Sequence, residues 1–361
     1  MKGRLGFMAR WARRAAALLL CLLLFPLPAP AGSPDFQVAE LEAEPAPGTT
    51  PAPSPSPAPS PSPLPSLGPP PFGGWPETDA EGFLPPGGAR AEFVYADEKE
   101  GRWVYLSPTL RVDIARCSAK VRGKNVVWFI SHVYFRGEEA FRAVSARKDK
   151  PAARAKPEAI AADNRLVYAQ NGDLFSWRLE KKERPGLIIR DGRVLHTLTY
   201  THPVAKIPPL DELALFPDGH VEMRTPGQMS AEEYLAHGAA DVLAFGPVLF
   251  SGRVLDGRLS KSFTHLEPRS ALGVVSPGHF VGIMVEGRNK RSAGAGLMFV
   301  AERLLEQGCT DAFTLDGGQT AAMVFMGKNV MDPGIYNGFH KTRNQQDVVG
   351  IGRFSPAEGA P

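Results

Sequence analysis

A short stretch near the end of the chain, FTLDGGQTAAM (313–323), interrupts an apolar run with polar residues. Asp316 supplies a carboxylate, the two glycines after it let the backbone approach a ligand closely, and Gln319 and Thr320 supply hydrogen-bonding groups. Asp-Gly is a common turn dipeptide, so an ordinary turn is the plainer interpretation. The sharper interpretation is the polar floor of a binding pocket at the end of a strand.

Strands are the main elements that would position this stretch. RWVYL (102–106) and RVDIARCSAKV (111–121) alternate apolar and polar residues, as half-buried strands do. NVVWFISHVYF (125–135) is apolar enough for a buried strand, and DAFTL (311–315) leads directly into Asp316. Two further places with strand patterns are RLVYAQNGDLF (165–175) and a hairpin with Asp191-Gly192 at its bend in GLIIRDGRVLHTLTY (186–200).

Few helices are expected among these strands. KPEAIAADN (156–164) is a short one, and Ser230 with Glu233 forms a capping box for a helix at 231–237. AGAGLMFVAERLLEQG (293–308) places its apolar residues on one face and ends at a glycine. Many strands with few scattered helices predict an α+β fold, a single domain of mostly antiparallel or mixed strands.

The N-terminus has the pattern of a secretory signal peptide. Four arginines precede the apolar run at 15–25, and the small residues Ala29-Pro-Ala31 follow it. This order predicts export with removal of residues 1–31. The run is short for a membrane span, but an uncleaved anchor and lipidation of Cys21 stay open as alternatives.

A tract rich in Pro, Ala and Ser follows, and it is densest at 45–71. Closely spaced prolines hold a backbone extended and remove its hydrogen-bond donors, so residues 32–90 are expected to be a linker, disordered or extended. Residues 91–354 then read as one domain, and 355–361 as a tail.

Composition argues against several function classes. The 41 basic and 38 acidic residues give a net charge of +3, which indicates no surface for nucleic acid. Cys117 and Cys309 could form one disulfide or remain buried free thiols. No Cys/His spacing resembles a zinc site, so no cofactor is predicted, and a lone Ca²⁺ held by scattered oxygens stays open.

Five ordered blocks together resemble the phosphodiester glycosidase family, over about 91–354. They are QNGDLF (170–175), AFGPVLFSG (244–252), PRSALGVVSPGHFVGIMVEGR (268–288), SAGAGLMFVAERLLEQGCTDAFTLDGGQTAAMVFMG (292–327) and RNQQDVVGIG (343–352). Several blocks in order are more specific than one Asp-Gly-Gly, and they favour the pocket interpretation of the opening stretch. Bacterial members of the family are often described as exopolysaccharide-associated, which agrees with export.

The resemblance is not complete in the opening stretch. Family members commonly read Asn-Leu-Asp-Gly-Gly-Gly-Ser-Ser, where this chain has Thr314 first and Gln319, Thr320 and Ala321 last. The aspartate of the family's usual Asp-Gly-Arg strand end is Glu286 in this chain. These departures bear on substrate identity and on activity.

The resemblance implies hydrolysis of a sugar-1-phosphodiester on the sugar side. Phosphate is a good leaving group, so the site must hold its charge and also supply a carboxylate for water or for the developing oxocarbenium. The implied catalytic residues are Asp316, Asp173 and Glu286. The implied substrate-binding residues are Asn171, Gly172, Arg269, Arg288, Ser292, Gly317, Gly318, Gln319 and Thr320.

In this hypothesis, Asp316 and Asp173 face one another across a pocket whose phosphate subsite uses the Gly317–Gly318 amides and Arg269. Asp173 could instead belong to an Asx turn, and the arginines and Glu286 could be solvated surface charges. His279 is expected to be a loop or packing residue before it is a ligand contact.

Two rival functions remain at this level. A non-catalytic module that binds a glycan or a sugar phosphate would keep the glycines and arginines but need no second carboxylate, so the pair of aspartates favours the enzyme. A phosphodiesterase that cuts the other ester bond would normally need a metal cluster. The expected partner is a phosphorylated glycan or sugar-1-phosphodiester, with no nucleic acid, and with a membrane only through an uncleaved N-terminal segment.

Overall fold

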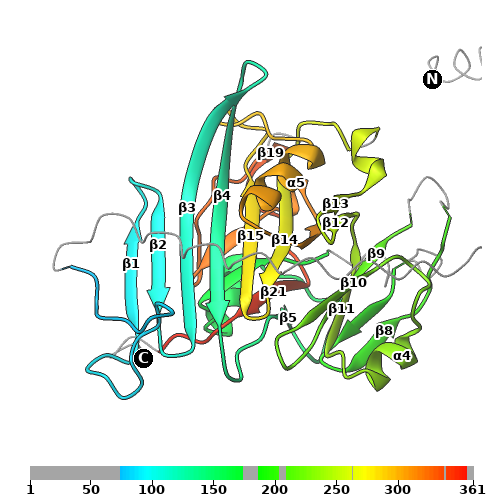
Figure 1. Cartoon of the computed structure of the whole chain (residues 1–361). Coiled ribbons are helices and arrows are strands. Elements are labelled where there is room, and N and C mark those ends of the chain that lie inside the picture. The colour runs from blue at the N-terminus through cyan, green and yellow to red at the C-terminus, as the bar shows by residue number, and fades with distance from the viewer. Residues whose placement is uncertain (1–73, 174–185, 203–208, 262, 337–338, 356–361) are drawn as a thin grey trace, which may run out of the picture. The chain divides into compact units, whose positions relative to one another are not determined.

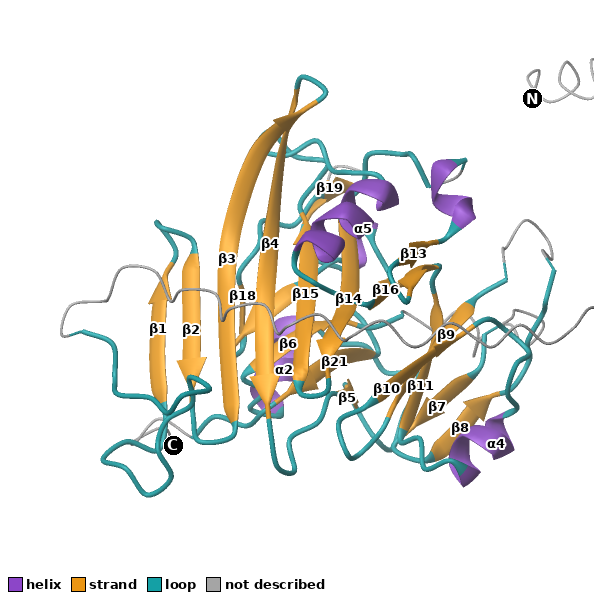
Figure 2. Ribbon diagram, in the orientation of Figure 1, coloured by secondary structure: helices purple, strands orange, loops and turns teal. Residues whose placement is uncertain are grey.

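Antiparallel strands dominate the computed structural model, which describes residues 74–173, 186–202, 209–261, 263–336 and 339–355 (Figures 1 and 2). All described residues belong to the second of two compact units, Ser60–Pro361. The expected signal peptide and most of the expected linker and tail lie outside the described residues. Among the described residues, no helix is both long enough and apolar enough to cross a membrane.

A nine-stranded sheet is the largest element of the fold, with strand order β1-β2-β3-β4-β15-β14-β16-β12-β13. Every neighbouring pair in it is antiparallel. Its strands are β1 Phe93–Asp97, β2 Arg102–Leu106, β3 Leu110–Val121, β4 Lys124–Phe135, β12 Val248–Ser251, β13 Val254–Leu255, β14 Arg269–Ser276, β15 His279–Val285 and β16 Asp311–Leu315. The β3–β4 hairpin projects beyond the neighbouring strands (Figure 1).

Two five-stranded sheets and one hairpin complete the β structure, and their printed pairs are also antiparallel. The sheet β10-β9-β11-β7-β8 contains β7 Ile188–Arg190, β8 Arg193–His196, β9 Asp211–Leu215, β10 Val221–Arg224 and β11 Asp241–Phe245. The sheet β18-β17-β6-β21-β5 contains β5 Arg142–Ser145, β6 Tyr168–Asn171, β17 Met323–Phe325, β18 Lys328–Asn329 and β21 Asp347–Ile351. The hairpin pairs β19 Ile335–Tyr336 with β20 Phe339–His340. This architecture confirms the predicted α+β class.

The two faces of the nine-stranded sheet bury different partners. Strand β4 shows the period-2 alternation, because Phe129 and Val133 join one core while Trp128 and Ile130 join another. The first core also contains side chains of both five-stranded sheets, including Tyr168 and Leu213 among others. The second core lies between the sheet and helix α5, Leu297–Glu306, which crosses β14 and β15 in Figure 2.

The other helices are short and agree with local sequence rules. Helix α4, Ala231–Ala236, has the predicted capping box, in which Ser230 accepts from the Glu233 amide and Glu233 accepts from the Ser230 amide. Helix α2, Pro157–Asp163, begins with proline at the first turn. Two 3₁₀ segments, η2 Gly257–Ser260 and η3 Gly318–Thr320, lie in loops.

The predicted hairpin at 186–200 is also present, as β7 and β8. Asp191 and Gly192 at its bend have φ angles of +53° and +69°. Two-residue hairpin turns that match the twist of the strands need a positive φ at both central residues. Asp-Gly adopts these angles readily, which is why this dipeptide predicted the bend.

The folded domain starts earlier than the predicted boundary at Ala91. Phe83 and Leu84 are 4% and 2% exposed, and Leu84 packs with Val104 and Leu106. Trp75 packs edge-on against Phe93, at 5.8 Å between ring centroids. Composition marked the whole of 32–90 as linker because prolines and glycines continue to residue 88, but the domain buries Phe83 and Leu84 and partly buries Trp75.

Candidate active site

Three segments that contain candidate site residues meet where three neighbouring inner strands of the nine-stranded sheet begin or end. Strand β14 begins at Arg269, β15 ends at Val285 and β16 ends at Leu315. The register pairs Arg269 with Val285 and Ser270 with Leu315, so these three ends are neighbours. The loops that follow or precede them therefore lie side by side, although up to about fifty residues separate them in sequence.

Strand β6 of the second five-stranded sheet ends at Asn171, and this residue contacts the loop that follows β16. The Asn171 side-chain amide donates to the Asp316 carbonyl at 2.7 Å, and its oxygen accepts from the Ala322 amide at 3.2 Å. The Asp316 amide donates to the Gly172 carbonyl at 3.3 Å. Asn171 is fully buried, so it fixes the loop that carries Asp316, in place of the sugar contact expected from the sequence.

Asp316 is half-buried at the end of β16, and one carboxylate oxygen accepts from the Gly317 amide at 2.8 Å. Burial raises the pKa of Asp316 to about 6, and the negative charge of Asp173 adds to the rise. The nearby Thr320 hydroxyl, the positive charge of Arg343 and the Gly317 amide act in the opposite direction. A carboxyl group that titrates near neutrality suits acid–base work, because both of its forms are populated at ordinary pH.

Asp173 lies close enough to influence Asp316, but its carboxylate is already engaged. One oxygen accepts from the Arg190 guanidinium at 2.8 Å and the other from the Ala244 amide at 2.9 Å. Arg190 also bonds Asp347 at 2.5 Å, and all three side chains are buried. The two expected carboxylates are thus brought together, whereas the expectation that Asp173 faces substrate as a free acid or base is corrected.

The three glycines of the site serve close packing. A Cβ atom at Gly172 would lie 2.1 Å from a carboxylate oxygen of Asp347, and one at Gly317 would lie 2.6 Å from the Pro268 carbonyl. Gly318 has a φ of +63°, and a Cβ there would lie 3.3 Å from the Arg288 guanidinium. These positions need glycine for space or backbone geometry.

The Gly317 and Gly318 amides were expected to hold a phosphate, and the structure gives them other acceptors. The Gly317 amide donates to Asp316, and the Gly318 amide donates to the Pro268 carbonyl at 2.9 Å. An anion could reach either amide only if those bonds were exchanged. Cationic side chains are therefore the better candidates for the phosphate subsite.

The two predicted arginines differ in where their guanidinium groups lie. Arg288 lies over Gly318 and bonds Glu267 at 2.5 Å, so it stays beside the loop of Asp316. Arg269 donates to the carbonyls of Ala295 and His265, at 3.1 and 2.9 Å. Arg269 thus fixes backbone before α5, and its assignment to the phosphate subsite stays a prediction.

Arg343 was missed by the sequence analysis. Its side chain is exposed, its charge acts on Asp316, and its amide donates to the Gln319 carbonyl at 2.8 Å. It is the first residue of the block RNQQDVVGIG, and that position was the available signal. Of the two predicted polar residues on this loop, Gln319 is half-buried and Thr320 is fully buried, and the Thr320 hydroxyl makes no hydrogen bond of good geometry.

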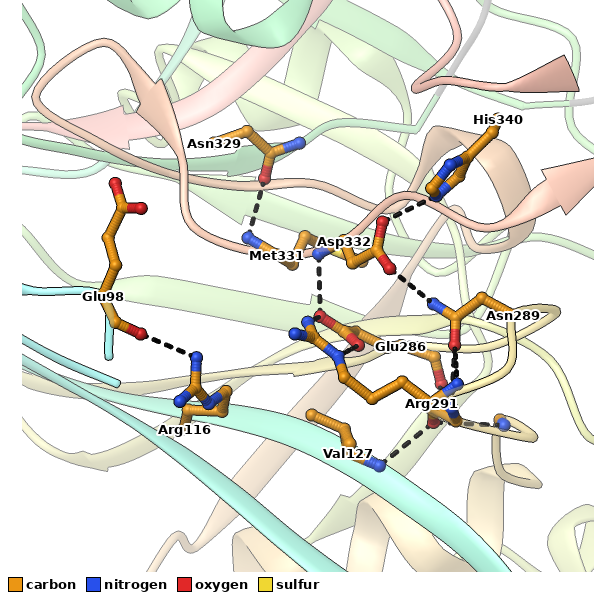
Figure 3. Close-up of polar contacts among 12 residues, drawn as sticks. Glu98, Arg116, Val127, Glu286, Asn289, Arg291, Asn329, Met331, Asp332 and His340 are labelled. Carbon is orange, nitrogen blue, oxygen red and sulfur yellow. Dashed lines mark hydrogen bonds and ion pairs between the residues drawn. The ribbon is translucent and has the colours of Figure 1, made fainter. Parts of the chain in front are cut away.

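Glu286 is fully buried and bridges two segments, as Figure 3 shows. It accepts from the Arg291 guanidinium through two nitrogens, one of them at 2.9 Å, and from the Asp332 amide at 2.7 Å. The Ser292 hydroxyl donates to the Glu286 carbonyl at 2.7 Å and accepts from the Val127 amide at 3.0 Å. In this structure both residues fix loops, and the predicted roles, catalysis for Glu286 and anion binding for Ser292, stay predictions.

A carboxylate–histidine pair that the sequence analysis did not find lies beside Glu286 in Figure 3. Asp332 bonds His340 at 2.6 Å, and its other oxygen accepts from the Asn289 side chain at 3.4 Å. Nothing in the local sequence marks this pair, because eight residues and a strand turn separate its members. His279 lies at the opposite end of β15 from Glu286, stacked on Tyr134 and bonded to His132 at 3.1 Å, which confirms the packing interpretation.

Cysteines, metal sites and the two best-formed hollows were compared with the candidate site in the described part of the chain. Cys117 and Cys309 are free thiols. No group of three or more His, Cys, Asp or Glu side chains among the described residues could hold a metal ion. Two hollows of about 970 and 860 Å³ lie beside α4 and β5, and neither is lined by a candidate site residue.

The candidate site lies within the part of the chain that a protein-family model matches. A family model described as phosphodiester glycosidase matches residues 164–351, just over half of the chain. A Bacillus subtilis (strain 168) protein, SPbeta prophage-derived uncharacterized protein YomE, is 29% identical over 174 residues. The match covers 47% of this chain but only 26% of that protein, so the shared region is a minor part of the relative.

One solved structure shares the architecture. The catalytic domain of zebrafish N-acetylglucosamine-1-phosphodiester alpha-N-acetylglucosaminidase, auto-inhibited by its pro-peptide, superposes with a TM-score of 0.51 at 18% identity. That superposition covers 73% of this chain and 89% of the zebrafish chain. A putative exported protein of Burkholderia pseudomallei K96243 gives a TM-score of 0.43 at 14% identity, over 63% of this chain and 74% of that one.

Proposed function

The chain belongs to the phosphodiester glycosidase family, and we propose that it hydrolyses a sugar-1-phosphodiester of an exported or cell-surface glycan, releasing the sugar from the phosphate. The observation that supports this most is the environment of Asp316. Burial raises the pKa of its carboxyl group to about 6, and the charge of the exposed Arg343 acts on it. The Arg288 guanidinium, paired with Glu267, lies over Gly318 in the same loop. A titrating carboxylate next to cations is the combination that glycosyl phosphate hydrolysis requires.

In the proposed reaction, a water oxygen attacks the anomeric carbon as the bond from that carbon to the phosphate oxygen breaks. Ionised Asp316 accepts a proton from the water, and the phosphate leaves with the electron pair of the broken bond. Arg343 and Arg288 hold the phosphate charge, so the leaving group needs no proton from the enzyme. Asp173 does not touch the reactants in this proposal, and its charge adds to the rise in the pKa of Asp316 that burial mainly causes.

A screen of the purified full chain against sugar-1-phosphodiesters tests this proposal. Free reducing sugar and a phosphate monoester should appear together, in equal amounts. Asp316→Asn should remove the activity, while Asp218→Asn, at an exposed turn, should retain it. The proposal fails if no sugar-1-phosphodiester in a panel of hexoses and N-acetylhexosamines, in both anomeric forms, is cleaved.

One observation favours the rival function, a non-catalytic module that binds a glycan or sugar phosphate. The second carboxylate, Asp173, is bound to Arg190 and is not available to substrate, so the pair of available carboxylates that argued for an enzyme is reduced to one. Isothermal titration with sugar-1-phosphodiesters that remain intact throughout the experiment would support this alternative. Hydrolysis during the titration would exclude it.

We also propose that the protein is exported. The basic residues, the apolar run at 15–25 and Ala29-Pro-Ala31 occur in the order of a cleaved signal. Mass spectrometry of the secreted or envelope fraction should find an N-terminus near residue 32. An intact Met1 on a cytoplasmic species would contradict export.

A further inference from the structure

Among the segments that contain basic residues and no acidic ones, three adjoin the candidate site. They are 114–137, 287–301 and 333–346. The whole chain is nearly balanced, with 41 basic and 38 acidic residues, so such segments concentrate positive charge. We define the basic rim as five exposed cations of these segments: Lys120, Arg122, Lys124, Lys290 and Arg343.

Backbone contacts join the first segment to the second. Lys120, Arg122 and Lys124, the three hairpin cations, lie at the tip of the β3–β4 hairpin. This tip projects beyond the sheet in Figure 1. Asn125, next to Lys124, accepts from the Ala293 amide at 2.9 Å, and the Val127 amide donates to Ser292 at 3.0 Å. The hairpin is therefore fastened to the loop that carries Lys290.

Further contacts join that loop to the loop of Asp316. Ala295 and Glu267 exchange two backbone hydrogen bonds, at 3.0 and 3.3 Å. Glu267 bonds Arg288, which lies over Gly318 in the loop of Asp316. The third segment joins at the same loop through Arg343, whose amide donates to Gln319. The three segments that carry the basic rim are thus linked to one another and to the loop of Asp316.

Three acidic side chains of the neighbouring loops contact basic side chains. Glu286 pairs with Arg291, Glu267 with Arg288, and Asp332 with His340. The five rim cations form no ion pair within 4 Å with any described residue. Their charge is therefore available to a ligand, and neighbouring like charges raise the local concentration of anions.

We propose that the basic rim binds an extended polyanion, so that the substrate is a polymer that carries several phosphates rather than a small sugar phosphodiester. This inference rests on the proposed function, because it concerns the substrate of the same site. One phosphodiester carries a single negative charge, which Arg343 and Arg288 would suffice to hold. The hairpin cations lie too far along the projecting tip to serve that same phosphate, but they suit further phosphates of a chain that leaves the site.

The test uses the full chain and a hairpin variant, Lys120→Glu/Arg122→Glu/Lys124→Glu. Fluorescence polarisation with labelled inorganic polyphosphate measures polyanion binding at several salt concentrations, with orthophosphate as competitor. A poly(sugar 1-phosphate) and a small sugar-1-phosphodiester serve as substrates. The hairpin variant should bind polyphosphate at least tenfold more weakly and show a log–log salt slope lower by about 2, at ~0.7 per phosphate contact on a flexible strand.

The same variant should raise the KM for the polymer at least tenfold and leave kcat/KM for the small substrate unchanged, because the hairpin lies outside the catalytic loop. A matched control, Arg193→Glu/Lys261→Glu/Arg353→Glu, reverses three exposed charges elsewhere, with the same change in net charge. It should bind polyphosphate as the unaltered chain does. Circular dichroism on both variants confirms that each is folded.

Two results would overturn the inference. Equal loss of binding in the hairpin variant and the control would show a response to net charge alone. Binding to vesicles with anionic lipids, but not to polyphosphate, would identify the rim as a membrane-binding surface. If no substrate at all is hydrolysed, the proposed function fails, and the polyphosphate binding still decides whether the rim recognises a polyanion.

Discussion

The Asp173 carboxylate and the Arg190 guanidinium form a fully buried ion pair at 2.8 Å. Arg190 bonds Asp347 as well and donates to the Val242 carbonyl at 2.6 Å. The pair therefore connects the end of β6 to β7 and β11, three strands that belong to two different sheets. Its main role is to hold the base of the candidate site together.

Replacement of Asp173 by Asn should destabilise the fold. The Arg190 charge would remain buried with one partner fewer, and breaking a buried pair in this way costs about 3–5 kcal/mol. Urea unfolding monitored by tryptophan fluorescence measures the change. The control is Asp149→Asn, which breaks an exposed pair with Arg147 and should leave the unfolding midpoint unchanged. An unchanged midpoint in the Asp173 variant would show that the pair has no structural role.

Asp316→Asn should reduce kcat by about 100-fold or more, the usual scale for a group that transfers a proton. The amide side chain keeps the size of the carboxyl group and can still accept from the Gly317 amide, so folding should be retained. Steady-state kinetics and circular dichroism measure the two effects. If the variant unfolds, or turns over substrate as fast as the unaltered chain, Asp316 is only a turn residue.

The activity should have an acid limb near pH 6. The proposed reaction uses ionised Asp316, and the pKa of this carboxyl group is raised to about 6, so protonation removes the active form below that pH. A plot of log kcat/KM against pH should therefore rise with a slope of about one up to the pKa of the free enzyme and then level off. A rate that instead falls as the pH rises through 6 would assign Asp316 as a general acid.

The histidine pair on the nine-stranded sheet should make the fold sensitive to acid. Burial lowers the pKa of His132 to about 4 and that of His279 to about 3, and Arg111 opposes their protonation further. Both folded-state values lie below the unfolded value of about 6.5, so stability is complete above pH 6.5 and is lost as the pH falls. The loss at pH 5 should be about 2 kcal/mol for each histidine.

Substitution separates this effect from general acid unfolding. His279→Phe keeps a ring against Tyr134 and removes one titrating group, so the stability difference between pH 7 and pH 5 should shrink. His237→Phe, at an exposed position after α4, should leave that difference unchanged. Chemical denaturation at the two pH values decides between them.

Local features of this protein could be predicted from sequence because they depend on near neighbours. The capping box of α4 needs only Ser230 and Glu233, and the bend of the β7–β8 hairpin needs only Asp191-Gly192. The apolar face of α5 follows from a period of 3.6 residues. Asp316 at the end of a strand belongs to this class too, since the strand and the polar loop are adjacent in sequence.

The tertiary structure decided which polar groups remain available for chemistry. The Asp173 carboxylate accepts from an arginine on another sheet, and the Asn171 side chain donates to the loop of Asp316. The Glu286 carboxylate accepts from Arg291 and from a backbone amide forty-six residues away. A buried polar group must find partners wherever the fold brings them, and no local pattern names those partners. The sequence by itself therefore determined the local elements and the position of Asp316 at the end of a strand, whereas long-range hydrogen bonding decided that Asp173, Glu286 and Asn171 have partners within the protein.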